Sequence, residues 1–189
     1  MDNRPIGIFD SGVGGLTVFK EIRKQLPNES LIYFGDTARV PYGSKSPATV
    51  QRYSLEIAKF LEMQNVKAIV IACNTASALA LTTLRNEIRL PIIGVIDPGV
   101  RAAIKAAHSG NIGVIGTKAT ISSEVYQNRI RRLRNSINVT AIACPLFVPI
   151  VEENLTNTKL ATDALDMYLS PFRKIDIKAL ILACTHYPI

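Results

Sequence analysis

The chain has 189 residues, 48% hydrophobic and 20% charged, a composition that supports a packed core and excludes an intrinsically disordered protein. Its 22 Lys and Arg against 15 Asp and Glu give a formal net charge of +7, but without Trp and with 6% aromatic residues it lacks a stacking platform for nucleic acid. No apolar run reaches the roughly 18 residues of a membrane span, and the N-terminus does not look like a signal peptide, so we expect a cytoplasmic protein that binds neither nucleic acid nor membrane.

Short apolar runs alternate with helical patterns along the chain, which is typical of βα units around a parallel sheet. Strands are predicted at residues 5–9, 30–35, 67–72, 92–95, 112–115, 139–143 and 179–183. Helices are predicted to begin near Leu16, Pro47, Thr75, Pro98, Ser122 and Lys159. The basic stretch 128–134 is predicted to be a solvated helix face. A shallow break at Asp97-Pro98-Gly99 divides the chain into two expected α/β domains, residues 1–97 and 98–189.

The two halves resemble each other in sequence. Residues 66–75 can be laid over 177–186 so that Cys73 falls on Cys184, and residues 6–11 can be laid over 112–117. Similar apolar strands arise easily by chance, but a matched cysteine followed by a polar pair does not. We therefore predict a duplicated α/β unit.

Polar motifs collect where the predicted strands end, which is where open parallel sheets bind their ligands. A glycine-rich loop at 10–15 follows the first strand, Pro41-Tyr42-Gly43 follows the second, and Cys73 and Cys184 each end a later strand. The loop has neither the ending of a P-loop nor the spacing of a dinucleotide fingerprint. A plain strand-to-helix turn and a site for an anionic ligand both remain open for it.

The pair of strand-end cysteines carries the strongest chemical signal. A buried cysteine is by itself most often a small hydrophobe, but Cys73 precedes a predicted helix and Cys184 lies two residues before His186. If the halves face each other by pseudo-twofold symmetry, two thiols flank one cleft and can move a proton between opposite faces of a tetrahedral carbon. Cys144, before a proline, is interpreted as structural, and His108 as a surface residue.

The sequence supports two other functions of these cysteines and the histidine less well, a zinc site and a thiol oxidoreductase. Zinc needs three or four converging ligands, and Cys-x-His is not a usual ligand spacing. A thiol oxidoreductase is weaker still, because the sequence contains no Cys-x-x-Cys. We therefore expect no metal site.

Five motifs in order, spread over the whole chain, resemble the glutamate racemases, a branch of the cofactor-independent aspartate/glutamate racemase superfamily. They are residues 8–16 (IFDSGVGGL), 33–37 (YFGDT) with 41–43 (PYG), 72–77 (ACNTAS), 116–120 (GTKAT) and 184–188 (CTHYP). Enzymes of this family are isomerases that interconvert L- and D-glutamate and supply D-glutamate for peptidoglycan. The resemblance implies a two-domain α/β enzyme with its active site between the domains, no cofactor, and glutamate as the small-molecule partner.

The resemblance also implies roles for individual residues. Cys73 would take the α-proton from D-glutamate with the help of Asp10, and Cys184 would take it from L-glutamate with the help of His186 and Glu152. From the sequence alone, Glu152 would be interpreted as a solvated helix carboxylate. The segments expected to hold the substrate contain Asp10, Ser11, Pro41, Tyr42, Gly43, Asn74, Thr75, Thr117, Thr120, Thr185 and His186.

The chemistry sets a further expectation. An amino-acid α-proton is very weakly acidic, so backbone donors and hydroxyls must stabilise the carbanion, and one thiol must be ionised while the other is protonated. We expect Asp10, His186 and the helix N-terminus to favour the thiolate. The resemblance is also compatible with a homodimer. Family members extend further than Ile189, so the C-terminal part of the family fold is expected to be absent, and a non-catalytic amino-acid-binding domain is the alternative function.

Overall fold

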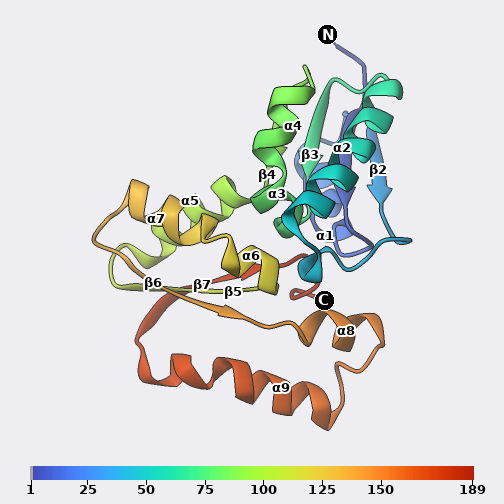
Figure 1. Cartoon of the computed structure of the whole chain (residues 1–189). Helices are drawn as coiled ribbons and strands as arrows, with labels where there is room; N and C mark the ends of the chain where they lie inside the picture. The colour runs from blue at the N-terminus through green and yellow to red at the C-terminus, as the bar shows by residue number, and fades with distance from the viewer. Residues whose placement is uncertain (1) are drawn as a thin grey trace. The chain divides into compact units, whose positions relative to one another are not determined.

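The computed structural model describes residues 2–189, and the chain divides into two compact units, Met1–Val95 and Ile96–Ile189 (Figure 1). Each unit contains a parallel sheet with helices, so the expected α/β fold with two parallel sheets is confirmed. Asp97-Pro98-Gly99 lies in the first turn of a helix rather than in a linker. Within residues 2–189, none of the helices is long and apolar enough to cross a membrane.

The first unit has a four-stranded sheet in the order β2-β1-β3-β4. Its strands are β1 (Ile6–Asp10), β2 (Leu31–Gly35), β3 (Ala68–Ile71) and β4 (Ile92–Gly94). Its helices are α1 (Leu16–Gln25), the 3-10 turn η1 (Tyr42–Ser44), α2 (Pro47–Met63), α3 (Asn74–Leu79) and α4 (Leu81–Glu87). Helix α2 begins as its sequence predicts, because Ser46 accepts a hydrogen bond from the amide of Thr49 and Pro47 occupies the first turn.

The second unit has a three-stranded sheet in the order β6-β5-β7. Its strands are β5 (Asn111–Gly116), β6 (Asn138–Ala143) and β7 (Ile177–Ala183). Its helices are α5 (Ile96–Ala107), α6 (Lys118–Ser122), α7 (Val125–Leu133), α8 (Phe147–Glu152) and α9 (Lys159–Leu169), followed by the 3-10 turn η2 (Ser170–Lys174). In Figure 1, α5 and α7 lie on one face of this sheet and α9 on the other.

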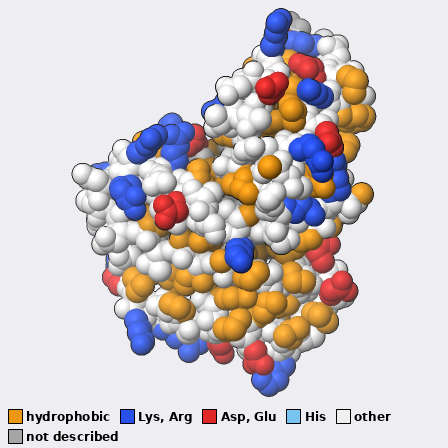
Figure 2. Space-filling model, viewed as in Figure 1, with side chains coloured by type: hydrophobic (Ala, Val, Ile, Leu, Met, Phe, Trp, Pro, Cys, Tyr) orange, Lys and Arg blue, Asp and Glu red, His pale blue; other side chains and the backbone are white. Residues whose placement is uncertain are grey.

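An apolar groove of about 310 Å³ lies on the α9 side of this second sheet. It is lined by residues of β5, β7, α8 and α9 and by the last residues of the chain, including Ile115, Phe147, Leu165, Leu180 and Ile189. Figure 2 shows hydrophobic side chains gathered over the region of α8 and α9. Leu180 is among the exposed large hydrophobic residues of the chain, so β7 presents apolar surface on this side.

The two sheets share one topology, which supports the internal repeat. In each unit the first strand lies between the second strand and the strand that precedes the cysteine. Phe9 of β1 pairs with Ile71 of β3, and Ile115 of β5 pairs with Leu182 of β7. These are the residues that fall on one another when the two halves of the sequence are superposed. The repeat therefore extends from residue type to strand register.

All seven strands lie where the sequence predicts them, whereas the helices differ in three places. The helix expected from Thr75 is two helices that meet at Ala80. The helix expected near Ser122 is also two, separated at Glu124, whose φ is +53°. No helix start was predicted for α8, although Glu152 at its end was expected on a helix. Pro149 occupies the third position of α8, where no preceding carbonyl awaits its missing N–H.

The basic stretch is the solvated helix face that its pattern predicts. Tyr126 and Ile130 are the buried residues of α7, while the side chains of Arg131 and Arg132 are exposed. Arg129 forms a two-pronged ion pair with Asp97 of α5, at 2.6 and 2.8 Å. Because both partners are about 40% exposed, this pair contributes little to stability. His108 is exposed, as expected.

Candidate functional site

The first polar cluster lies at the carboxyl end of the first sheet. Asp10 ends β1 and is fully buried, and Cys73 follows β3 and is also buried. The Cys73 thiol donates to Oγ of Ser11 at 3.7 Å. In turn, Sγ of Cys73 accepts the amide of Ala76 at 3.4 Å, so that the cysteine caps helix α3. The structure thus brings together Asp10, Ser11 and Cys73, three residues that the sequence places in one site.

The glycine-rich loop is folded back on the Asp10 carboxylate. Oδ2 of Asp10 accepts the amide of Gly12 at 3.0 Å, and the Tyr33 hydroxyl donates to the Gly12 carbonyl at 2.7 Å. Sequence reasoning included Tyr33 in a motif but assigned it no role. Its role could have been inferred from its position on β2, which pairs with β1. From that strand the Tyr33 hydroxyl reaches the loop that follows β1.

The loop also requires a residue without a side chain at Gly15. A Cβ there would lie 2.4 Å from Cβ of Asp10 and 2.8 Å from the Tyr33 hydroxyl. We expect Gly15→Ala to lower the free energy of unfolding by about 2 kcal/mol, because backbone and buried side chains must shift. The matched control is Gly99→Ala in α5, whose Cβ would meet nothing closer than 3.9 Å and which should raise stability by about 0.5–1 kcal/mol. Urea unfolding of both variants checks this, and equal effects would contradict it.

Burial dominates the electrostatics of Cys73. Removal from water and, to a smaller extent, the nearby Asp10 carboxylate raise the pKa of the Cys73 thiol to about 12, against the lowering effect of the hydrogen bond from the Ala76 amide. The helix N-terminus therefore acts in the expected direction. The expectation that Asp10 favours the Cys73 thiolate is wrong for an ionised carboxylate, because two negative charges repel. Without substrate, Cys73 is a neutral thiol at physiological pH.

This raised pKa predicts a loss of stability in alkali. The ordinary thiol pKa is near 9 and the folded value is about 12, so the folded protein keeps a proton that the unfolded chain loses. The stabilisation is complete below about pH 9 and disappears as the pH rises towards 12. Between pH 8 and pH 10, the free energy of unfolding of the wild type should therefore fall by about 1.4 kcal/mol more than that of Cys73→Ser. Denaturant titrations at the two pH values measure this difference, and parallel losses would contradict it.

The segment Pro41-Tyr42-Gly43 is arranged with its aromatic side chain inwards. Tyr42 is 1% exposed and belongs to the hydrophobic core of the first unit, while Pro41 is exposed and Gly43 is partly buried. The Tyr42 hydroxyl donates to Oδ2 of Asp36 at 2.5 Å. The Tyr42 side chain is thus part of the core, and Pro41 is the exposed residue of this segment. Asp36, like Tyr33, belongs to the motif of residues 33–37, for which the sequence predicted no individual role.

The second polar cluster lies at the carboxyl end of the second sheet. Cys184 directly follows β7, and its Sγ is 3.9 Å from Nδ1 of His186. Nε2 of His186 is hydrogen-bonded to Oε1 of Glu152, the last residue of α8. His186 is 2% exposed and the Glu152 side chain 34%. Glu152 is therefore paired with the histidine and is not a simple solvated carboxylate.

The remaining polar residues of the expected site are buried in the same two clusters. In the first unit, Asn74 and Thr75 are the first residues of α3. In the second, Thr117 caps α6 by accepting the Thr120 amide at 3.3 Å, and the two threonine hydroxyls are 2.9 Å apart. Thr185 lies between Cys184 and His186 and is buried. Buried hydroxyls and amides thus accompany each cysteine.

Cys144 differs from the other two cysteines. It is fully buried behind the end of β6, and its thiol donates to the Ile142 carbonyl at 3.7 Å. Its own carbonyl accepts the Tyr187 hydroxyl at 2.9 Å. Its described hydrogen bonds are to backbone and to a tyrosine, which fits a structural residue. Within residues 2–189, His, Cys, Asp and Glu form no group of three or more that could hold a metal ion.

Comparison with known proteins identifies the class to which this fold and these clusters belong. Residues 6–189 match the family model of the Asp/Glu/hydantoin racemases. The chain belongs to this family.

Within the family, the chain is similar to glutamate racemases, as its motifs indicate. It is 55% identical to the glutamate racemase of Geobacter metallireducens over 98% of this chain and 69% of that protein. The crystal structure of a glutamate racemase isoform from Bacillus anthracis superposes with a TM-score of 0.95 at 47% identity, covering all of this chain and 71% of the other. A glutamate racemase from Francisella tularensis in complex with D-glutamate gives a TM-score of 0.92, also at 47% identity, over 100% and 71% of the two chains.

Proposed function

We propose that this chain is a glutamate racemase that moves a proton between Cys73 and Cys184 through the α-carbon of glutamate. The observation that carries the proposal is the matched pair of buried cysteines at equivalent strand ends, each beside a group that exchanges protons. Asp10 accompanies Cys73, and His186 with Glu152 accompanies Cys184. Similarity at 47–55% identity to glutamate racemases supports the choice of substrate.

The proposed reaction transfers one proton in and one proton out. The Cys73 thiolate removes the α-proton of D-glutamate, and the electron pair of the broken C–H bond stays on carbon. The Cys184 thiol then donates its proton to the opposite face, which gives L-glutamate, a Cys73 thiol and a Cys184 thiolate. The reverse reaction begins with Cys184 as the base. Each step conserves charge.

The carbanion must be stabilised by protein groups. The buried hydroxyls and amides beside the two cysteines can donate hydrogen bonds to the substrate carboxylates, and those made to the α-carboxylate stabilise the negative charge that develops there. We assign this binding role to the segments around Ser11, Pro41 to Gly43, Asn74 and Thr75 in the first unit, and around Thr117, Thr120 and Thr185 in the second. Such donors act most strongly where water is excluded.

Each cysteine must also be supplied with the correct protonation state. An ionised Glu152 accepts a hydrogen bond from Nε2–H of His186, which leaves the Nδ1 lone pair facing Sγ of Cys184. His186 can then take the Cys184 proton, and Glu152 stabilises the resulting imidazolium. Because Glu152 is partly exposed, protons can exchange with water at that end. Asp10 serves Cys73 by accepting the thiol proton. While Asp10 is ionised, its negative charge disfavours a thiolate beside it, and taking up the proton removes that charge.

This activity would supply D-glutamate to peptidoglycan synthesis in the cytoplasm. The alternative is a protein that binds an amino acid without turning it over. The chain spans 69–71% of the length of these relatives. The two functions differ in whether the α-hydrogen is exchanged.

Incubation with D-glutamate in deuterated water distinguishes the racemase from a protein that only binds the amino acid. We expect the α-proton NMR signal to disappear while the optical rotation falls to zero, because every racemisation event inserts solvent deuterium. The double variant Cys73→Ser with Cys184→Ser is the control and should leave both signals unchanged. Binding of glutamate without exchange from either enantiomer would refute the racemase and support the binding domain.

A further inference from the structure

The loop between β2 and α2 contains a buried carboxylate that the proposed mechanism does not use. Asp36 directly follows β2 and is 5% exposed. Its backbone amide donates to the carbonyl of Asp10 at 3.0 Å. The position of Asp36 is therefore tied to the end of β1, where the first polar cluster begins.

The Asp36 carboxylate binds two side chains of its own loop. Oδ2 accepts the Tyr42 hydroxyl at 2.5 Å, and Oδ1 accepts Nε–H of Arg39 at 3.0 Å. Arg39 is in turn ion-paired with Glu56 of α2. A buried carboxylate with charged and neutral donors is strongly held, because hydrogen bonds to ions are about twice as strong as those between neutral groups.

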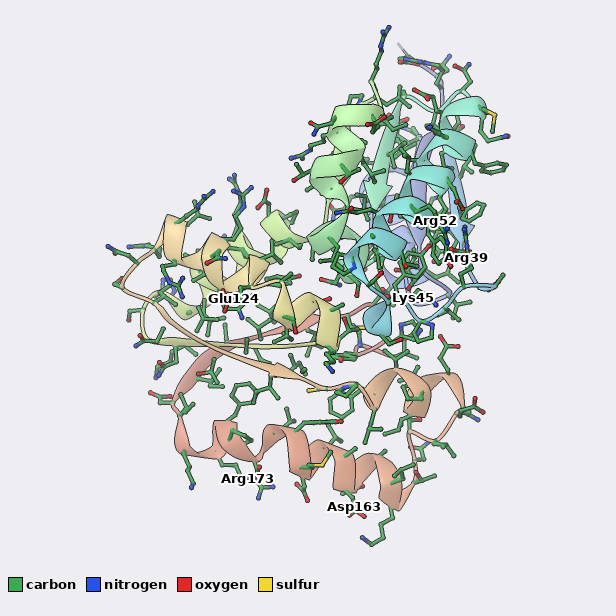
Figure 3. The ribbon with its side chains drawn as sticks, in the orientation of Figure 1. Arg39, Lys45, Arg52, Glu124, Asp163 and Arg173 are labelled. Carbon is green, nitrogen blue, oxygen red and sulfur yellow. The ribbon has the colours of Figure 1, made fainter. Side chains whose placement is uncertain are left out.

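Aromatic contacts extend this network onto α2. The guanidinium carbon of Arg39 lies 4.2 Å from the centre of the Tyr53 ring, and that of Arg52 lies 5.0 Å from it. Figure 3 shows Arg39 and Arg52 close together beside α2. The Tyr53 ring packs on the Tyr42 ring at 5.9 Å. Tyr42 is thus held at its hydroxyl by Asp36 and on its ring by Tyr53.

We propose that Asp36 is a positioning residue that orients the backbone of Pro41 to Gly43 for glutamate by holding the Tyr42 hydroxyl inside the core. With the phenol anchored there, the neighbouring Pro41 is exposed and Gly43 is partly buried, while the Asp36 amide ties the same loop to the carbonyl of Asp10. This inference rests on the proposed function, because that function assigns the segment to the substrate. Asp36 itself touches neither substrate nor thiol in this role.

Two variants test the anchor from its two ends. Asp36→Asn removes the charge, and Tyr42→Phe removes only the hydroxyl, leaving Arg39 on the carboxylate so that folding is preserved. For both we expect the KM for D-glutamate to rise about 10-fold, the worth of a hydrogen bond to a charged group, with kcat little changed. The double variant should be no worse than the worse single one, since both remove the same contact. The control is Glu29→Gln, which breaks the partly buried ion pair with Lys67 at the start of β2 and should leave KM unchanged.

Hydrogen exchange supplies a readout that does not depend on activity. The amide of Lys45 donates to the Tyr42 carbonyl at 3.0 Å, whereas that of Ala72 donates to Phe9 at 2.8 Å inside the sheet. In Asp36→Asn and Tyr42→Phe, exchange at Lys45 should accelerate about 10-fold, while Ala72 stays unchanged. Unchanged exchange at Lys45 in Tyr42→Phe would overturn the positioning role, whatever happens to KM. If the wild type neither binds nor racemises glutamate, the proposed function fails, and the Lys45 exchange still decides whether Asp36 orders this segment.

Discussion

Replacing either Cys73 or Cys184 with serine is expected to lower the rate of racemisation by about 10³-fold or more. An alcohol is a far weaker acid than a thiol, so a serine at either position stays protonated and cannot accept the α-proton at neutral pH. Both cysteines are buried and the hydroxyl is smaller than the thiol, so the fold should tolerate the change. Polarimetry starting from each enantiomer measures the loss.

The two variants should differ in the hydrogen exchange that survives. Cys73→Ser retains the base for L-glutamate and should exchange only that enantiomer in deuterated water, whereas Cys184→Ser should exchange only D-glutamate. Cys144→Ser is the control and should racemise normally, because its thiol donates to a backbone carbonyl within its own segment. An essential Cys144 together with a dispensable Cys73 would show that the two-thiol assignment is wrong.

Glu152→Gln is expected to slow racemisation by about 10²-fold. Glutamine can still accept a hydrogen bond from Nε2 of His186, so the ring keeps its orientation, but the negative charge that stabilises the imidazolium is lost. The effect should fall on the Cys184 half of the reaction. Exchange of L-glutamate should slow while exchange of D-glutamate by Cys73 stays close to the wild-type rate.

The neighbouring residue provides a matched control for this variant. Glu153 is exposed and next in the chain, so Glu153→Gln removes the same charge from the same helix end without touching His186. It should leave both exchange rates unchanged. Equal losses in the two variants would mean that the general electrostatic field, and not the contact with His186, is responsible. Melting temperatures of both variants close to that of the wild type would show that a slower reaction is due to catalysis and not to loss of folding.

The strands and the repeat could be predicted because their signals are local. Continuous apolar runs such as residues 68–72 are typical of strands whose two faces are both buried in a parallel sheet. The superposition of Cys73 on Cys184 needed only residue types and predicted a duplicated α/β unit, and the two sheets have equivalent strand registers. The start of helix α8 was not predicted. Pro149 is tolerated there because it lies in the first turn, where its missing N–H has no carbonyl partner.

The parts of the candidate site that depend on local motifs were predicted, whereas those that depend on packing were not. Asp10 and Ser11 follow a strand in an evident motif, and their contact with Cys73 follows from adjacent parallel strands that end at one edge. The expectation that Asp10 favours the thiolate was wrong because two negative charges repel, whereas the larger effect of burial could not be predicted because the sequence carries no information on burial. Removal from water sets the direction of the Cys73 pKa, and it depends on the packed core.

The sequence by itself determined the class of fold, the internal repeat, and the two cysteines at equivalent strand ends, since these depend on local patterns and on motifs. Only the tertiary structure decided that Glu152 meets His186, 34 residues further along the chain, and that Tyr42 points into the core towards Asp36. Glu152 looks like a solvated carboxylate, and Tyr42 like a loop residue, until neighbouring elements are packed around them. Such pairings depend on how a short helix or loop packs against a strand end, and on how much water that packing removes, which residue types alone do not specify.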